Sequence, residues 1–229
     1  MKSLERVNDG VLSGIERPAL AWLARRMAAW VLPDHLTALG LAGALLTAAG
    51  FVLSRGSLSW LWLASSGLIV NWAGDSLDGT LARLRKIERP RYGFLVDHAT
   101  DLFCQVITFL SLGLSPLTHF AVACLGLITF LMAFVFSLIH AHAHGIMRIT
   151  YFYFGPTEIR ALLLGGNLLV LTVGVVDLRI WLALTAKWGA ITIHDLVIAT
   201  LSLAGAVLIA ALAIRDARTL AKLDPPPPP

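Results

Sequence analysis

The sequence predicts an all-α integral membrane protein, with six transmembrane helices preceded by an N-terminal amphipathic surface helix. Of its 229 residues, 57% are hydrophobic and only 14% are charged, whereas a soluble domain carries about a quarter charged residues. The apolar residues gather in six long stretches. Helices are expected there, because lipid offers the backbone no hydrogen-bond partners, whereas a helix pairs its own N–H and C=O groups.

The first region, residues 1–34, differs from these stretches because arginines and glutamates mix with tryptophans along it. Over residues 4–32 this mixture is typical of an amphipathic helix that lies along the membrane surface. Gly14 and Pro18 predict an interruption within that helix.

Six apolar stretches follow, and each approaches or exceeds the roughly 20 residues that a transmembrane helix needs. They occupy residues 36–54, 58–82, 93–115, 117–143, 157–176 and 194–214. Together they predict one membrane domain over residues 35–222. Residues 223–229 end in a run of prolines, a composition that predicts a disordered tail.

The distribution of positive charge predicts the orientation in the membrane. With six spans, the N-terminus, the 83–92 loop, the 144–160 connection and the C-terminus lie on one side. All but three of the 18 Lys and Arg residues fall on that side, the exceptions being Arg55, Arg179 and Lys187. Because cytoplasmic loops carry the excess of Lys and Arg, we expect a cytoplasmic-membrane protein with both termini inside the cell.

Four aspartates lie at the facing ends of the second and third stretches. Asp75 and Asp78 are three residues apart, and Asp97 and Asp101 are four apart, so each pair shares one helical face. Measured from the opposite membrane side at about 1.5 Å per residue, Asp75 lies at a depth of about 25 Å and Asp101 at about 21 Å. Two antiparallel helices would therefore bring both pairs to one level near the cytoplasmic face.

Four carboxylates in a site with little water repel one another, and bound divalent cations would neutralise their charge. An oxygen-only site suits Mg²⁺ or Mn²⁺ (or Ca²⁺) rather than zinc. Gly79, Ala82 and Gly93 leave room for a ligand beside the aspartates, and Arg83 offers a planar donor fork suited to phosphate. An acidic network that only joins two helices, or a cation pathway, stays open as the alternative.

The same segment resembles the signature of the CDP-alcohol phosphotransferase family. That signature is Asp, two residues, Asp-Gly, two residues, Ala-Arg, a spacer, Gly, three residues, Asp, three residues and Asp. Every fixed position matches, and the matching residues are Asp75, Asp78, Gly79, Ala82, Arg83, Gly93, Asp97 and Asp101. The spacer holds nine residues, where the family usually has eight.

The resemblance implies a membrane enzyme that transfers a substituted phosphate group from a CDP-linked donor to an alcohol hydroxyl and releases CMP. It implies a two-metal site, in which Asp75, Asp78 and Asp97 hold one Mg²⁺ or Mn²⁺ ion. Asp101 would join a second ion and act as general base. The active site would then be cytoplasmic.

Nucleotide-binding residues are implied in the same way. From the signature they are Gly79, Ala82, Arg83 and Gly93. The family also carries a Pro-Asn-x-x-Thr motif at the start of the first span, which here is Pro33-Asp34-His35-Leu36-Thr37. Thr37 keeps its place and Asp34 replaces the Asn, so these two residues complete the implied set.

His98 follows the third aspartate directly, and this arrangement resembles the choline and ethanolamine phosphotransferase branch. A histidine so placed could assist proton transfer, and the alternative is an interfacial ring turned away from the metals. The phosphatidylglycerophosphate synthase branch usually has Pro at this position and Lys after the fourth aspartate. This chain has His98 and Leu102, which argues against that branch.

Candidate acceptor-binding residues lie around the start of the fifth stretch. Arg160 resembles the basic residue with which inositol-phosphate-using members hold an anionic acceptor, and Arg148 is close enough in sequence to join it. Glu158, in the Thr157-Glu158 pair, instead resembles the amino-alcohol branch. The alternative is that the two arginines only follow the positive-inside rule.

His140, His142 and His144 form a His-Ala-His-Ala-His run at the end of the fourth stretch. His140 and His144 share a helical face and could bind a transition metal. The run contains no carboxylate or cysteine, so the sequence favours an interfacial, solvated role.

The sequence as a whole favours an enzyme of phospholipid biosynthesis. The expected donor is of the CDP-diacylglycerol or CDP-amino-alcohol type, with at least one lipid substrate and no nucleic-acid partner. A choline/ethanolamine-type member acting on diacylglycerol, or one that uses an inositol-phosphate-type acceptor, remains an alternative. A cation transporter that uses the acidic cluster is the non-enzyme alternative, although its carboxylates would be expected nearer mid-membrane. Family members are often homodimers, so a homodimer is expected.

Overall fold

The computed structural model describes residues 5–7, 12–144, 146–148, 155–175 and 191–224. Helices dominate these residues. In chain order the elements are β1 (Glu5–Val7), α1 (Ser13–Arg26), α2 (Pro33–Leu53), η1 (Leu58–Trp60), α3 (Leu61–Arg85), α4 (Pro90–Gly113), α5 (Phe120–His144), β2 (Ile146–Arg148), α6 (Pro156–Val173) and α7 (Ile193–Leu223). The proline tail that was predicted to be disordered lies, from residue 225 onward, outside the described residues.

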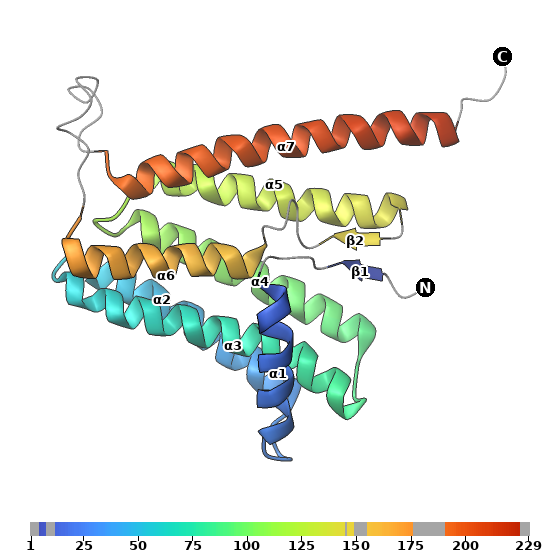
Figure 1. Ribbon diagram of the computed structural model, residues 1–229, viewed down its shortest axis with the longest axis horizontal. Coiled ribbons are helices and arrows are strands. Elements are labelled where there is room, and N and C mark those ends of the chain that lie inside the picture. Colours follow the sequence, from blue (N-terminus) through green and yellow to red (C-terminus); the bar gives the residue numbers. More distant parts are fainter. Residues whose placement is uncertain (1–4, 8–11, 145, 149–154, 176–190, 225–229) are drawn as a thin grey trace.

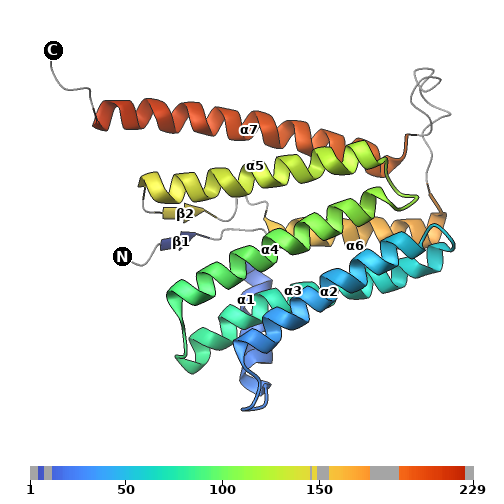
Figure 2. The same ribbon diagram turned by 180° about the vertical axis from the view of Figure 1, so that it is seen from behind.

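The long helices α2 to α7 lie side by side as a bundle in both ribbon views (Figures 1 and 2). Five of them, α2, α4, α5, α6 and α7, are long and apolar enough to cross a membrane. The helix α3 has 25 residues, but Asn71, Asp75 and Asp78 lower its apolar content. The fold is therefore that of a helical membrane protein, and the sixth span stays a prediction.

The last helix extends further than the sequence predicts. The apolar stretch ends at residue 214, whereas α7 continues to Leu223. The added residues are mostly Ala, Leu, Arg and Lys, which form helix as readily as the apolar residues before them. Hydropathy marks the end of an apolar stretch, and it does not mark the end of a helix.

The two strands were not expected from the sequence. β1 and β2 pair in parallel, with Arg6 opposite Met147. The pairing brings the chain before α1 next to the chain that follows α5.

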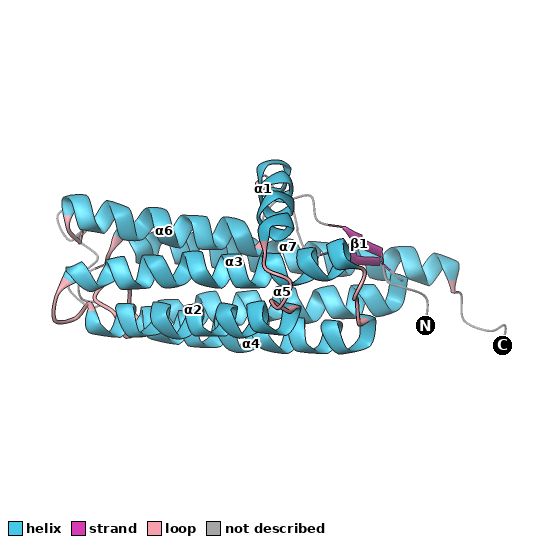
Figure 3. Cartoon of the chain, turned by 90° about the horizontal axis from the view of Figure 1, so that it is seen from below, coloured by secondary structure: helices cyan, strands magenta, loops and turns pink. Residues whose placement is uncertain are grey.

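The helix α1 crosses the bundle instead of joining it (Figures 1 and 3). The predicted interruption is wrong, because α1 runs without a break from Ser13 to Arg26 and contains Pro18. Proline removes one helical hydrogen bond there. The packing of Leu20 and Ala24 against leucines of α2 and α3 offsets that loss.

The outer side of α1 presents apolar and cationic side chains together. Ile15 is 77% exposed and Trp22 is 54% exposed, and the Arg26 guanidinium lies 3.8 Å from the centroid of the Trp22 ring. Such a surface suits the headgroup region of a bilayer. The position of α1 at the membrane surface stays a prediction.

Glu16 joins α1 to the two helices beneath it. Its Oε1 accepts hydrogen bonds from Trp72 Nε1 at 2.7 Å, Ser76 Oγ at 3.1 Å and Thr157 Oγ1 at 3.2 Å. Trp72 and Ser76 belong to α3, and Thr157 belongs to α6. One carboxylate oxygen therefore connects three helices.

Replacing Glu16 with Leu is expected to loosen α1, because three partly buried donors lose their acceptor at about 1–3 kcal/mol for each unsatisfied group. Glu16→Gln keeps a side-chain carbonyl and should retain most of the contact. Tryptic cleavage at Arg25 and Arg26 measures the effect in detergent. Ile15→Ala, at an exposed position of the same helix, is the control. Wild-type protease resistance of Glu16→Leu would show that this contact does not hold α1 in place.

The helices α2 and α3 pack backbone to backbone along a glycine stripe. The stripe consists of Gly40, Gly43, Gly50, Gly67 and Gly74. A Cβ added to Gly43 would lie 2.3 Å from the Asn71 amide nitrogen, and one added to Gly74 would lie 2.4 Å from the Gly40 amide nitrogen. Only glycine permits so close an approach, and small residues are a common means of joining helices in lipid.

The helices α5 and α7 begin at the same end of the bundle and run in the same direction (Figure 1). Asp195, in the first turn of α7, accepts hydrogen bonds from the Thr118 hydroxyl and, at 2.7 Å, from the His119 backbone N–H. Its other oxygen lies 2.8 Å from His119 Nδ1 and accepts from the Thr192 backbone N–H at 2.9 Å. This network sets the register of α7 against α5.

Candidate active site

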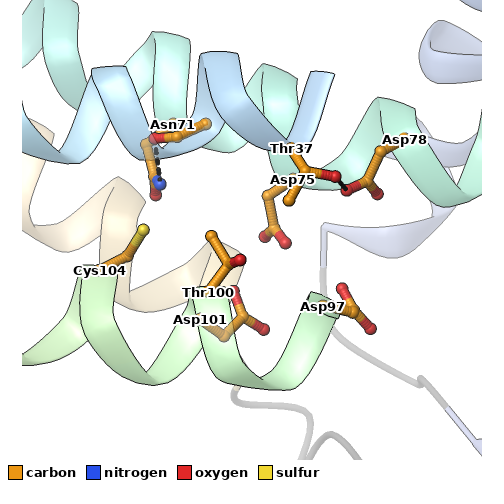
Figure 4. A pocket seen from close by; sticks show the side chains of 9 residues that line it. Thr37, Asn71, Asp75, Asp78, Asp97, Thr100, Asp101 and Cys104 are labelled. Carbon is orange, nitrogen blue, oxygen red and sulfur yellow. Dashed lines mark hydrogen bonds between the residues drawn. The ribbon is translucent and has the colours of Figure 1, made fainter. Parts of the chain in front are cut away.

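A pocket lies between α2, α3 and α4, at the level of the four aspartates (Figure 4). Its lining comprises Thr37 and Gly40 from α2, Asn71, Asp75 and Asp78 from α3, and Asp97, Thr100, Asp101 and Cys104 from α4. Both aspartate pairs therefore meet in one site.

Three of the carboxylates form a compact cluster. One oxygen from each of Asp75, Asp97 and Asp101 lies within 4.8 Å of the other two. The three side chains are 23–30% exposed, so they are only partly solvated. Anionic oxygens this close to one another repel, and a cation between them relieves the repulsion.

Asp78 lies beside this cluster and is held by α2. Thr37 Oγ1 donates to Asp78 Oδ2 at 2.6 Å, a bond that Figure 4 shows. One turn further along α2, the Gly40 carbonyl oxygen accepts from Asn71 Nδ2 at 2.9 Å. These two bonds and the glycine stripe fix α2 against the helix that carries Asp75 and Asp78.

Arg160 of α6 reaches the carboxylate cluster and is buried. Its Nη2 lies 2.8 Å from Asp75 Oδ2 and 3.9 Å from Asp101 Oδ1, and its side chain is 7% exposed. Within the described part of the chain, its Nε has no hydrogen-bond partner. One guanidinium against four carboxylates leaves the pocket with excess negative charge.

Four signature residues lie near the pocket in sequence but do not line it. They are Gly79, Ala82, Arg83 and Gly93, on the last turns of α3 and the first turn of α4. Arg83 is exposed, and its Nη2 donates to Thr80 Oγ1 at 3.3 Å. A Cβ added to Gly93 would meet nothing within 4 Å, so space is open beside it. Their contact with a nucleotide stays a prediction.

Asp34 pairs with the loop before α4 and with the first turn of α4. Arg89 Nη2 lies 2.6 Å from the Asp34 carboxylate, and the Tyr92 hydroxyl donates to the same carboxylate at 3.3 Å. Arg89 and Tyr92 both belong to the nine-residue spacer, so this exposed ion pair fastens the longer loop to α2. A nucleotide contact by Asp34, which also stays a prediction, would compete with the pair.

His98 packs among aromatic rings and is absent from the pocket lining. Its ring stacks on Phe94 with centroids 4.2 Å apart and lies 5.8 Å from Phe134 of α5. His98 Nδ1 is 2.9 Å from the Phe94 carbonyl oxygen and 3.4 Å from Asp97 Oδ2. The ring thus lies between the aromatic cluster and Asp97, and both the catalytic role of His98 and the alternative of a ring turned away from the metals stay predictions.

Glu158 has a structural role in α6. Its Oε2 accepts the Gly155 backbone N–H at 2.9 Å, and its Oε1 accepts the Leu12 backbone N–H at 3.1 Å. Both oxygens thus accept from backbone N–H groups, and one of these donors, that of Leu12, lies just before α1. Acceptor binding by Glu158 stays a prediction, and the Arg148 side chain lies outside the described residues.

The family model described as CDP-alcohol phosphatidyltransferase matches residues 30–214, a range that includes the whole pocket lining. The chain belongs to this family. Comparison with curated proteins yields no match. Family membership supports a transferase of the kind that acts in phospholipid synthesis, and the five apolar helices agree with a membrane enzyme.

CDP-alcohol phosphatidyltransferases use divalent metals, and the donors in this pocket fit such an ion. The cluster of Asp75, Asp97 and Asp101 offers carboxylate oxygens, which Mg²⁺ and Mn²⁺ prefer. Arg160 offsets only part of the negative charge. The pocket is therefore suited to binding at least one divalent cation.

Four lining residues of this CDP-alcohol phosphatidyltransferase were missed in the sequence. Asn71 lies one turn before Asp75, so a polar side chain inside an apolar stretch was the available signal. Cys104 is a small residue inside an apolar stretch and is 2% exposed, so nothing in the sequence indicated its position against the pocket. Gly40 and Thr100 are ordinary in a membrane helix and gave no signal.

Proposed function

We propose that this CDP-alcohol phosphatidyltransferase transfers a substituted phosphate group from a CDP-linked donor to an alcohol hydroxyl and releases CMP. The observation that carries the proposal is the carboxylate cluster of Asp75, Asp97 and Asp101, drawn from two facing helices inside the family match. The donor is of the CDP-diacylglycerol or CDP-amino-alcohol type, and at least one substrate is a lipid.

The four pocket aspartates are the proposed metal ligands. Asp75, Asp78 and Asp97 would hold one Mg²⁺ or Mn²⁺ ion, and Asp101 would join a second. When bound, these ions neutralise charge on the donor diphosphate and on the departing CMP. Arg160 adds a fixed positive charge next to Asp75 that does not depend on metal.

Asp101 is the proposed general base. Its carboxylate takes the proton of the acceptor hydroxyl while that oxygen bonds to the β-phosphorus of the donor. The bond between the β-phosphorus and the oxygen bridging to the α-phosphate breaks, and CMP leaves with that oxygen. The acceptor oxygen remains in the new phosphodiester.

The nucleotide is proposed to lie over the last turns of α3, along Gly79, Ala82 and Arg83. The exposed guanidinium of Arg83 donates to Thr80 and is suited to a phosphate. The space beside Gly93 is open, which supports a ligand position on the α4 side.

Arg160 favours an acceptor that carries its own anionic group, such as an inositol phosphate. Its guanidinium lies beside both Asp75 and the proposed base Asp101, where it could bind a phosphate near the reacting hydroxyl. A diacylglycerol acceptor offers no such group.

We also propose a homodimer in the cytoplasmic membrane, with both termini and the pocket on the cytoplasmic side.

CMP release by the purified full-length protein tests the proposal. The panel pairs CDP-diacylglycerol, CDP-choline and CDP-ethanolamine with inositol phosphate, glycerol phosphate and diacylglycerol. At least one pair should release CMP with Mg²⁺ or Mn²⁺, EDTA should abolish release, and restored metal should recover it. If no pair releases CMP but vesicles take up cations in a manner that requires Asp75, the protein is a transporter instead.

A further inference from the structure

A second cluster of metal-ligating side chains lies outside the aspartate pocket, towards the ends of α5 and α7. One ligand atom from each of His140, His144 and Asp216 lies within 4.8 Å of the other two. Asp216 follows His140 by 76 residues, the same separation as between His119 and Asp195 at the start of these helices. The register set at one end therefore carries Asp216 to the histidines at the other.

The cluster is largely removed from solvent. The His140 side chain is 10% exposed and that of Asp216 is 15% exposed, with His140 Nδ1 2.9 Å from Asp216 Oδ2. The His144 ring stacks on His140 with centroids 4.4 Å apart. Among the described residues, the buried His144 Nε2 has no hydrogen-bond partner. A buried polar atom without a partner is unfavourable, and a bound ion would satisfy it.

One oxygen of Asp216 and the end of α5 are available to a cation. Asp216 Oδ1 lies 3.1 Å from Nη2 of Arg215, whose side chain is 61% exposed, so the second oxygen is left for the histidines. The cluster lies at the last turn of α5, where free backbone carbonyls give the helix end a partial negative charge.

The donors differ in kind from those of the aspartate pocket. Two imidazole nitrogens and one carboxylate oxygen are ligands typical of zinc, whereas an oxygen-only site suits Mg²⁺. The three donor atoms lie within 4.8 Å of one another, close to the spacing that ligands need around a zinc ion with bonds of about 2.0–2.2 Å. His142 lies on another face of α5 and is exposed, so it takes no part.

We propose that His140, His144 and Asp216 form a transition-metal site of the Zn²⁺ type, which clasps α5 to α7. Two of its ligands were visible in the sequence as an i, i+4 pair. The third comes from a helix that begins almost 50 residues later in the chain, so only the packing of α7 on α5 shows it. The site is independent of the reaction proposed for the aspartate pocket.

Metal binding by the purified full-length protein tests this site. Excess Mg²⁺ is included to occupy the aspartate pocket. After chelator treatment and dialysis, the wild type should take up one Zn²⁺ per chain. Co²⁺ in its place should give the intense visible absorption of a four- or five-coordinate ion with nitrogen ligands. His144→Ala and Asp216→Asn should each weaken Zn²⁺ binding by at least about 10–100-fold, and His142→Ala should leave it unchanged.

Thermal unfolding separates a clasp from loose surface binding. Zn²⁺ should raise the melting temperature of the wild type and of His142→Ala, but not that of Asp216→Asn, which keeps the side-chain volume and serves if His144→Ala does not fold. Zn²⁺ uptake that fails in the wild type, or that persists in both ligand variants, would overturn the proposal and leave a hydrogen-bonded His140–Asp216 contact only.

Discussion

Asp101→Asn is expected to lower kcat for CMP release by roughly 10²–10⁴-fold, the range that a positioned general base contributes. Asparagine preserves the size of the side chain and keeps one oxygen in the pocket, but it cannot take the hydroxyl proton. The loss should appear mainly in kcat, because Thr37 and the α3 face that would bind the donor are unchanged. Steady-state assays across a range of donor concentrations measure kcat and KM.

Glu88→Gln is the matched control, because it neutralises an exposed carboxylate in the loop between α3 and α4 and should retain wild-type activity. Circular dichroism and gel filtration of Asp101→Asn show whether the helices stay intact. An Asp101→Asn protein that kept wild-type turnover would remove the assignment of Asp101 as the base, although Asp75 and Asp97 could still bind metal.

Gly43→Ala is expected to destabilise the protein by about 3 kcal/mol or more and to abolish activity. Its new Cβ would lie 2.3 Å from a backbone nitrogen of α3, and backbone atoms cannot rotate out of the way. Overpacking in a tight core costs about 1–3 kcal/mol even where side chains can adjust. Thermal unfolding in detergent, together with CMP release, measures the two losses.

Gly165→Ala provides the comparison, because a Cβ added at this position of α6 would meet nothing within 4 Å. Alanine also has the higher helix propensity, so this variant should be as stable as the wild type. Equal stability of the Gly43→Ala and Gly165→Ala proteins would mean that α2 and α3 do not meet as closely as the structure shows.

Features encoded within one helix were accessible from the sequence. The 3.6-residue period places Asp75 with Asp78 and Asp97 with Asp101, and the polarity of these residues inside apolar stretches made them conspicuous. The helix positions followed from hydropathy to within a few residues, except at the end of α7. The family signature then added the chemistry that spacing alone left open.

Features that depend on a partner from another helix were not accessible. The Glu158 carboxylate accepts a hydrogen bond from the backbone N–H of Leu12, which is 146 residues away in the chain. The glycine stripe has a helical spacing that is visible in the sequence, but spacing alone does not identify which helix approaches it. His98 is a similar case, because its stacking depends on where Phe134 of α5 lies.

The close contact between α2 and α3 limits how the enzyme can move during turnover. Thr37 and Asp78 lie on helices whose backbones touch, so their separation is fixed through the reaction cycle. Asp101 lies on α4, which packs on α2 and α5 and makes little contact with α3. Arg160 reaches the site from α6 through one side chain. Any rearrangement that accompanies substrate entry and product exit is therefore expected between α3 and α4, and a spin-label pair on these two helices would report it.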